Sequence, residues 1–237
     1  MSWLLEVEGV HAHYDKSHIL HGVHLAIGAG EIVSLLGRNG SGRSTTLKTI
    51  MGLVTPSSGA VRLDGVDLAG VRAYRIVRAG LAYVPEEREI FANLTVDENL
   101  RIGMQAARHG APVWTPEQMY SYFPQIEARR NTKAGMLSGG EQQMLTICRS
   151  LLGNPRVILI DEPTEGLAPM IVEVVLNVIR DICHRGVAVL LVEQKLTIAL
   201  RVSARVYVMG HGRIVFEGTP EDLRNAPEVR RDWLEVA

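Results

Sequence analysis

A short apolar segment runs directly into a glycine-rich turn in the first fifth of this 237-residue chain. The predicted strand covers residues 31–36, the glycine-rich stretch covers residues 37–42, and a helix is expected over residues 44–51. Glycine lets the backbone wrap closely around phosphate oxygens, and the N–H groups of a helix N-terminus supply positive partial charge. Strand, glycine turn and helix in this order predict an α/β fold that contains a phosphate-binding loop.

The next two residues differ in how well they match the phosphate-loop pattern. Ser44 matches, and its hydroxyl is expected to bind the Mg²⁺ ion that bridges the outer phosphates of a nucleotide. Arg43 stands where the pattern has lysine, and a guanidinium is wide and planar where an ammonium is a compact point charge. The retained charge predicts that nucleotide binds, but misplacement against the transition-state charge costs on the order of a hundredfold in rate. We therefore expect slow hydrolysis, and a regulatory subunit that binds nucleotide without hydrolysing it stays open as an alternative.

An acidic pair, Asp161-Glu162, follows the apolar run at residues 157–160. This run and another at residues 187–192 lack polar alternation, which is typical of strands buried on both faces of a parallel sheet. Open α/β sheets bind their ligands at the carboxyl ends of such strands. Asp161 is therefore predicted to hold Mg²⁺, and Glu162 is the candidate base that polarises the attacking water.

A serine and two glycines precede the helix that is expected from residue 141. They belong to the stretch Leu-Ser-Gly-Gly-Glu-Gln-Gln over residues 137–143, which is a further anion site at a helix N-terminus. Together with the glycine loop and the acidic strand end, this stretch resembles the signature of the ABC ATPases, and the resemblance covers essentially the whole chain. It implies a P-loop NTPase fold of the ABC ATPase type and ATP hydrolysis that is coupled to transport across a membrane.

The resemblance also implies which residues handle ATP. In this family two cassettes pair head to tail, so that each ATP lies between the phosphate loop of one and the signature of the other. The implied ATP contacts are Tyr14, which matches the aromatic that stacks on adenine, and Gly37, Arg38, Asn39, Gly40, Ser41, Gly42, Arg43, Ser44 and Thr45. The implied contacts to the ATP of the partner are Leu137, Ser138, Gly139, Gly140, Glu141 and Gln142.

Two of the implied catalytic residues depart from the usual family pattern. Glu86 falls where the family usually has the glutamine that links the Mg²⁺ site to the helical subdomain, and it is expected to bind the metal with Ser44 and Asp161. Gln194 falls where the family usually has a histidine that contacts the γ-phosphate. An amide can hydrogen-bond a phosphate but cannot carry the charge of an imidazolium. Both residues are expected to act with Glu162.

Three loops resemble one of the two cassettes of branched-chain amino acid importers. They are Pro85-Glu86, residues 165–169 and Val192-Glu193-Gln194. Importers of urea, short amides or another amino acid share the pattern and stay open, because the solute is read by other subunits. The resemblance implies three kinds of partner: a second cassette, identical or different, transmembrane permease subunits and, indirectly, a periplasmic solute-binding protein.

We expect residues 1–237 to form a single nucleotide-binding domain. An antiparallel β-subdomain is predicted near the N-terminus from strands at residues 3–10 and 18–27 and a hairpin at residues 61–68. A helical signature subdomain is expected at about residues 88–149, within the same single domain. Alternating elements then follow, with helices at 141–152, 170–184 and 196–202, strands at 157–160 and 187–192, and a hairpin at 206–217.

Composition argues against two other classes of protein. A formal net charge of -1 and 5% aromatic residues are unlike a nucleic-acid-binding protein, which needs a basic excess or stacking rings. The chain also lacks a basic segment followed by an apolar run at its N-terminus, and it has no stretch of about 18 apolar residues. We therefore expect a cytoplasmic protein that is held at the inner face of the cell membrane by its partners.

Several histidines gather near Tyr14. They are His11, His13, His18, His21 and His24, and His11 and His13 are expected on one face of a strand. No regular ligand spacing and no cysteine accompanies them, so ordinary surface histidines are favoured over a metal site.

Overall fold

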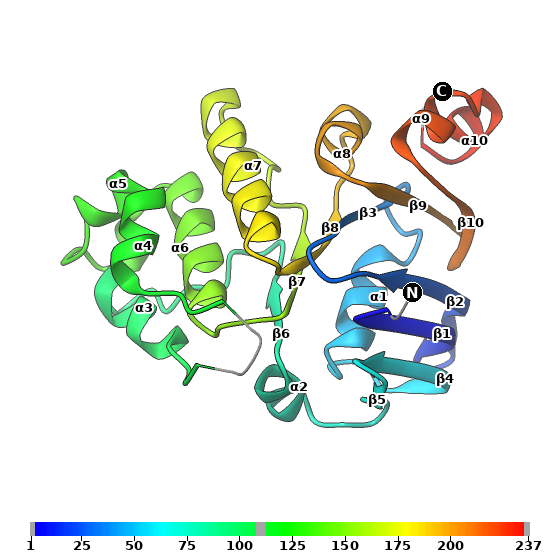
Figure 1. Ribbon diagram of the computed structural model, residues 1–237, viewed down its shortest axis with the longest axis horizontal. Helices are drawn as coiled ribbons and strands as arrows, with labels where there is room; N and C mark the ends of the chain where they lie inside the picture. Colours follow the sequence, from blue (N-terminus) through cyan, green and yellow to red (C-terminus); the bar gives the residue numbers. More distant parts are fainter. Residues whose placement is uncertain (1–2, 108–111, 235–237) are drawn as a thin grey trace.

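In the computed structural model, which describes residues 3–107 and 112–234, the strands form two sheets of different kinds (Figure 1). The first sheet is antiparallel, with the order β2-β1-β4-β5. Its strands are β1 (Leu5–Tyr14), β2 (Ser17–Ile27), β4 (Pro56–Leu63) and β5 (Val66–Asp67). The second sheet has the order β10-β9-β3-β8-β7-β6, with β10 antiparallel to β9 and the other neighbours parallel. Its strands are β3 (Ile32–Leu36), β6 (Leu81–Val84), β7 (Val157–Asp161), β8 (Ala188–Val192), β9 (Arg205–Gly210) and β10 (Arg213–Gly218).

The helices fall into groups that Figure 1 separates clearly. A lateral group lies away from the antiparallel sheet and contains α3 (Val96–Gly103), α4 (Pro116–Tyr122), α5 (Pro124–Glu127), the 3₁₀ turn η1 (Ala134–Met136) and α6 (Gly139–Leu151). The remaining helices accompany the sheets: α1 (Arg43–Ile50), α2 (Ala73–Ala79), α7 (Pro169–His184), α8 (Leu196–Val202), α9 (Pro220–Arg224) and α10 (Pro227–Trp233). The expected α/β fold, with an antiparallel β part near the N-terminus and inserted helices in the middle, is confirmed.

Strands β7 and β8 are buried on both faces because their successive side chains enter different hydrophobic cores. Leu159 and Leu190 join the core that contains Leu47 of α1 and the antiparallel sheet. Ile158, on the opposite face, joins the core that contains α6 and α7, including Ile179. The absence of polar alternation in these strands therefore has the predicted cause.

Helix α6 begins at Gly139, two residues before the start that the sequence suggested. Ser138 is its N-cap: the Ser138 hydroxyl accepts a hydrogen bond from the Glu141 N–H, while the Glu141 carboxylate accepts one from the Ser138 N–H. This capping box satisfies two backbone donors that a helix N-terminus otherwise leaves free.

Several other expected boundaries were wrong. Strand β1 runs on to Tyr14, and β4 begins already at Pro56, because residues 56–58 pair with the far end of β1. Proline is tolerated there because it is the first residue of the strand. Strand β6 and helix α2 were not predicted, since four and seven residues are too few for a clear periodic pattern.

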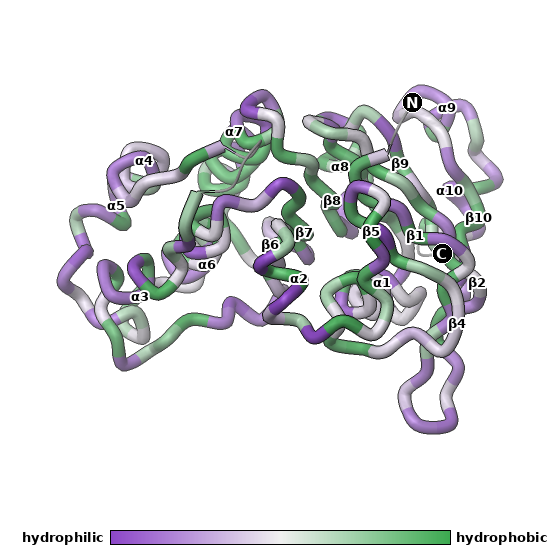
Figure 2. Tube along the Cα trace, turned by 60° about the horizontal axis from the view of Figure 1, so that its bottom comes forward, coloured by the Kyte–Doolittle hydropathy of each residue, from purple (hydrophilic) through white to green (hydrophobic). Residues whose placement is uncertain are grey.

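Hydropathy follows this architecture. In Figure 2 hydrophobic colour concentrates on the interior strands and on α7, and hydrophilic colour on outlying turns. Within the described part of the chain, no helix combines the length and the apolar character that crossing a bilayer requires.

Candidate functional site

The predicted phosphate loop connects β3 to α1, and its backbone requires glycine. A Cβ atom at Gly37 would lie 2.5 Å from the carbonyl oxygen of Met209, and Gly42 has φ +108° at the N-cap of α1. The buried hydroxyl of Ser41 has no hydrogen-bond partner among the described residues. A phosphate oxygen would satisfy that hydroxyl, because buried polar groups in folded proteins are nearly always hydrogen-bonded.

Arg43, the residue that departs from the loop pattern, is buried and joins three segments. Its Nη2 atom donates to Glu162 Oε1 at 2.8 Å and to Asn39 Oδ1 at 3.2 Å. Its Nη1 atom donates to the carbonyl oxygen of Glu193 at 3.1 Å. The guanidinium therefore ties the phosphate loop to the ends of β7 and β8, which a lysine with one nitrogen at its tip cannot do in the same way.

Glu162 sits immediately after β7 in a left-handed backbone conformation, with φ +46°. A non-glycine residue in this region is uncommon and strained, so the surrounding structure must hold it there. Its N–H donates to the carbonyl oxygen of Val192 at 2.9 Å. Burial raises the pKa of Glu162 to about 7; Arg43 opposes this rise, and Glu165 and Glu86 add to it.

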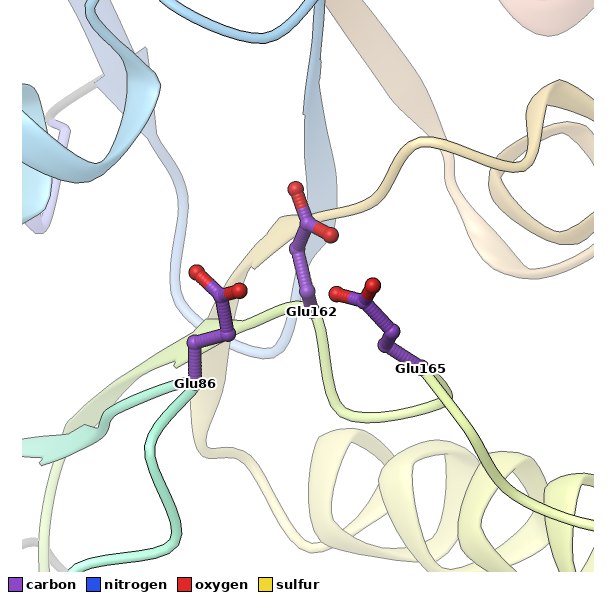
Figure 3. Close-up of side chains that lie close together, drawn as sticks. All are labelled: Glu86, Glu162 and Glu165. Atoms are coloured by element: carbon purple, nitrogen blue, oxygen red, sulfur yellow. The ribbon is translucent and has the colours of Figure 1, made fainter.

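Three carboxylates gather in front of β7. Figure 3 shows Glu86, Glu162 and Glu165 side by side, and one oxygen of each lies within 4.8 Å of the others. Burial, followed by the charges of Asp161, Glu165 and Glu87, raises the pKa of Glu86. The structure thus brings Glu86 and Glu165 to Glu162.

Asp161 is almost fully buried at the end of β7. Its Oδ2 atom accepts a hydrogen bond from the Tyr83 hydroxyl at 3.3 Å, and its carboxylate also accepts one from the Ser44 hydroxyl. Burial raises the pKa of Asp161 in spite of these bonds. Its Oδ1 atom is buried without a partner among the described residues. A buried, unpartnered carboxylate oxygen beside a hydroxyl fits the all-oxygen ligand set that Mg²⁺ prefers.

Gln194 reaches the phosphate loop, because its Nε2 atom donates a hydrogen bond to Asn39 Oδ1. The preceding residue, Glu193, is buried, and its Oε1 atom accepts a 2.8 Å hydrogen bond from the Thr164 hydroxyl. This bond links the loop after β8 to the loop after β7. Sequence reasoning did not predict this bond, and it gave Tyr83 no role at the site. Tyr83 could have been found only by predicting β6, the strand beside β7.

Tyr14 ends β1 opposite Ser17, and its side chain is 45% exposed. The hairpin that carries it is tied to the phosphate loop through Gly212, in the turn between β9 and β10. The N–H of Gly212 donates to the carbonyl oxygen of Ser41 at 2.9 Å, and the carbonyl oxygen of Gly212 accepts from the His21 N–H at 2.8 Å. A Cβ atom at position 212 would overlap the carbonyl oxygen of Ile19, so only glycine fits this bridge.

Three other positions of the predicted loop differ in their surroundings. Arg38 is exposed and donates to the carbonyl oxygen of Arg231 at 3.3 Å. Thr45 lies with Ser44 in the first turn of α1. Gly40 has φ +77° with open space around it.

The signature stretch is not part of this group. It opens α6, which lies apart from α1 in Figure 1. The Ser138 hydroxyl hydrogen-bonds to Glu141, and Gln142 Nε2 donates to the carbonyl oxygen of Leu137 at 3.1 Å, so these side chains are engaged within their own segment. A Cβ atom at Gly139 would overlap the guanidinium of Arg88, whereas one at Gly140 would only touch Leu167 and Ile171.

A comparison with known proteins finds relatives across the whole chain. A family model described as "ABC transporter" matches residues 20–165. A high-affinity branched-chain amino acid transport ATP-binding protein, BraG of Pseudomonas aeruginosa, is 39% identical over 98% of this chain and 99% of the relative. A lipopolysaccharide export system ATP-binding protein, LptB of Haemophilus influenzae, is 34% identical over 98% of this chain and 97% of the relative. Among solved structures, a nucleotide-free ATP-binding cassette from an ABC transporter superposes with a TM-score of 0.82 at 26% identity, covering 96% of both chains.

Proposed function

Because the chain belongs to the ABC transporter family as an ATP-binding subunit that hydrolyses ATP, we propose that it powers an importer of branched-chain amino acids. The family identified from the sequence is thereby confirmed. The proposed solute is inferred from two relatives. BraG is 39% identical to the chain, and a probable branched-chain amino acid transport ATP-binding protein, LivF of Archaeoglobus fulgidus, is 37% identical. Lipopolysaccharide export is the second candidate, because LptB proteins are 30–34% identical to the chain.

One observation carries the proposed mechanism: the loop after β3 and the end of β7 bring a loop cation, a strained carboxylate and a buried carboxylate to one place. These are Arg43, Glu162 and Asp161. The glycine loop would surround the phosphates of ATP with N–H groups, and Tyr14 would stack on the adenine. Ser44, Asp161 and Glu86 would hold Mg²⁺, which supplies positive charge against the outer phosphates.

Glu162 then has the role of general base. Its carboxylate accepts a proton from the water whose oxygen attacks the γ-phosphorus, and the bond from that phosphorus to the bridging oxygen of ADP breaks. Gln194 would donate an amide hydrogen bond to the γ-phosphate from its position beside Asn39. Arg43 would contact the phosphates only after its hydrogen bond to Glu162 opens, because one guanidinium edge cannot face both groups.

The signature residues would serve the ATP of a second cassette. Support comes from their position: Ser138, Gly139 and Gly140 open α6, away from the chain's own phosphate loop (Figure 1). A helix N-terminus with small residues suits a γ-phosphate that another subunit presents. The assembly would pair this chain with an identical or different cassette and with permease subunits. A periplasmic solute-binding protein would act on it only through those permeases, and the chain itself would lie at the inner face of the membrane.

The test is solute-dependent ATP turnover in the assembled complex. The chain would be coexpressed with candidate permeases, a second cassette and a binding protein, and the complex reconstituted into proteoliposomes. We expect hydrolysis to rise when the binding protein carries leucine, isoleucine or valine, and to disappear in Glu162→Gln. A rise with urea, a short amide or lipopolysaccharide instead would replace the solute and leave the ATPase standing. ATP binding with no hydrolysis in any condition would favour the regulatory subunit.

A further inference from the structure

Four histidines form a compact array on one face of the β1–β2 hairpin. His11 and His13 are two residues apart on β1, and they pair across the strands with His21 and His18 of β2. Side chains two residues apart on a strand point to the same face, and directly opposed residues on neighbouring strands are neighbours on that face. The pattern His-x-His on one strand with histidines opposite is a two-by-two arrangement of imidazoles.

The rings of this array contact one another. His18 is central: its ring stacks on His13 with centroids 4.1 Å apart and an interplanar angle of 11°, and it lies 3.9 Å from the ring of His21. His11 Nδ1 and His18 Nε2 are 3.0 Å apart. His13 and His18 are exposed, so burial of apolar surface does not account for the ordering of these side chains.

The separation of the two nitrogens suits a metal ion. Imidazole nitrogens bind Zn²⁺ at about 2.0–2.1 Å, so two of them on one ion lie roughly 3 Å apart when they occupy neighbouring coordination positions. At 3.0 Å, His11 Nδ1 and His18 Nε2 already meet this condition. Their present hydrogen bond would be replaced by two bonds to the ion.

The neighbourhood also favours imidazoles with a free lone pair. The Ser57 hydroxyl donates to the carbonyl oxygen of His11 at 3.3 Å, so its contact with His13 Nδ1 at 3.1 Å is one in which His13 donates. The proton is then on Nδ1 of His13, and its Nε2 is free to bind a metal. Such outer hydrogen bonds fix the tautomer of metal-binding histidines.

We propose that the array of His11, His13, His18 and His21 binds a first-row transition-metal ion such as Zn²⁺ or Ni²⁺, with His11 and His18 as the primary pair. His13 and His21 complete the coordination after rotation of their side chains away from the stack. Imidazole suits these ions, whereas Mg²⁺ prefers oxygen ligands, so the site is chemically distinct from the carboxylates at β7. The ion would join β1 to β2 near the turn that follows Tyr14, the last residue of β1. This proposal does not depend on the transported solute or on ATP hydrolysis.

The test is isothermal titration calorimetry. ZnCl₂ or NiCl₂ is titrated into the untagged, chelator-treated chain at about pH 7.5, without ATP or Mg²⁺. We expect one ion per chain, and affinity about tenfold or more weaker in the double variant His11→Gln/His18→Gln. His24→Gln is the matched control, because His24 is an exposed histidine of the same strand whose Nδ1 accepts from the Gly9 N–H, outside the array. The control should bind as the wild type does.

Thermal unfolding is the second readout, and it distinguishes a loss of metal binding from a folding defect in the variant. Binding to the native chain should raise the midpoint of thermal unfolding of the wild type and of His24→Gln, and not that of the double variant. The midpoints without metal should agree among all three, because the substituted side chains lie at the surface. Should the double variant unfold early, His13→Gln/His21→Gln is measured in its place, and it should show the same loss. Equal affinity in the wild type and both double variants, or an equal loss in His24→Gln, would overturn the proposal.

Discussion

The guanidinium of Arg43 donates a 2.8 Å hydrogen bond to Glu162 Oε1, and both side chains are at least nine-tenths buried. The cation of the phosphate loop thus holds the proposed base of the same chain. A buried ion pair is not by itself evidence of high stability. Removing one partner nevertheless destabilises the fold, because the other charge stays buried without a counter-charge. If the proposed roles hold, phosphate and base would compete for one guanidinium during catalysis.

Arg43→Lys should increase the rate of ATP hydrolysis. An ammonium has one nitrogen where the guanidinium uses two to contact Asn39, the Glu193 carbonyl and Glu162, so it should be held less tightly there and be freer to lie between the β- and γ-phosphates. The increase should reach about a hundredfold at most, the range that misplacement costs. Phosphate release by the assembled transporter measures it, with Lys48→Arg as control, since Lys48 is an exposed cation of the same helix. A turnover equal to or below that of the wild type would contradict the competition.

Hydrolysis should rise with pH through the neutral range. The pKa of Glu162 is raised to about 7, mainly by burial, so below this pH the base is protonated and cannot take a proton from water. We expect kcat/KM to increase about tenfold per pH unit well below 7 and to level off above it. The profile is measured between about pH 5.5 and 9. Arg43 lowers this pKa, so Arg43→Ala should move the inflection to higher pH, and a profile that falls with pH would be inconsistent with Glu162 as the base.

Tyr14→Ala should weaken ATP binding. Stacking of a base on an aromatic side chain contributes roughly 1–3 kcal/mol, which corresponds to about a 5- to 150-fold change in the dissociation constant. Titration calorimetry with Tyr14→Phe and Tyr74→Ala provides the comparison, because Phe retains the ring and Tyr74 is a similarly exposed tyrosine on α2. Unchanged affinity in Tyr14→Ala would remove the stacking role.

Thr164→Val should destabilise the protein by about 1–3 kcal/mol, because it leaves the buried Glu193 carboxylate without its hydroxyl donor. Burial already raises the pKa of Glu193, and the Thr164 bond opposes that rise. Ionised Glu193 is therefore disfavoured in the folded state, and stability is lost as pH rises through its folded pKa. Since the variant raises that pKa further, its deficit should be larger at about pH 8 than at about pH 5. Thermal unfolding of Thr164→Val and Thr164→Ser at both pH values checks this; Ser keeps the hydroxyl and should stay close to the wild type.

The parts of the fold that could be predicted are those with strong local patterns. The buried run before Asp161-Glu162 predicted both β7 and the acidic residues at its end, because strands covered on two faces need no polar alternation. Gly42 and Ser44 likewise follow from the local chemistry of the loop. Strand β6 was not predicted because Leu81–Val84 is too short to distinguish from a loop. The position of Tyr83 beside Asp161 was therefore not predicted either.

Contacts that join distant segments could not be predicted. Arg43 meets Glu162 and Glu193 across 119 and 150 residues of sequence, so no local pattern reports them. The histidines were interpreted as ordinary surface residues because their spacing along the chain is irregular. Register shifts between β1 and β2 bring them onto one face, and those shifts are visible only in the paired strands.

The bridge through Gly212 places the proposed nucleotide site where two sheets meet. The proposed adenine platform belongs to the antiparallel sheet and the predicted phosphate loop to the mostly parallel one, and a single residue in the β9–β10 turn, Gly212, hydrogen-bonds to both sides. The β9–β10 turn would therefore set the distance between the adenine base and the phosphates of a bound nucleotide. Lengthening it would alter which nucleotides span the gap without changing any residue that contacts one.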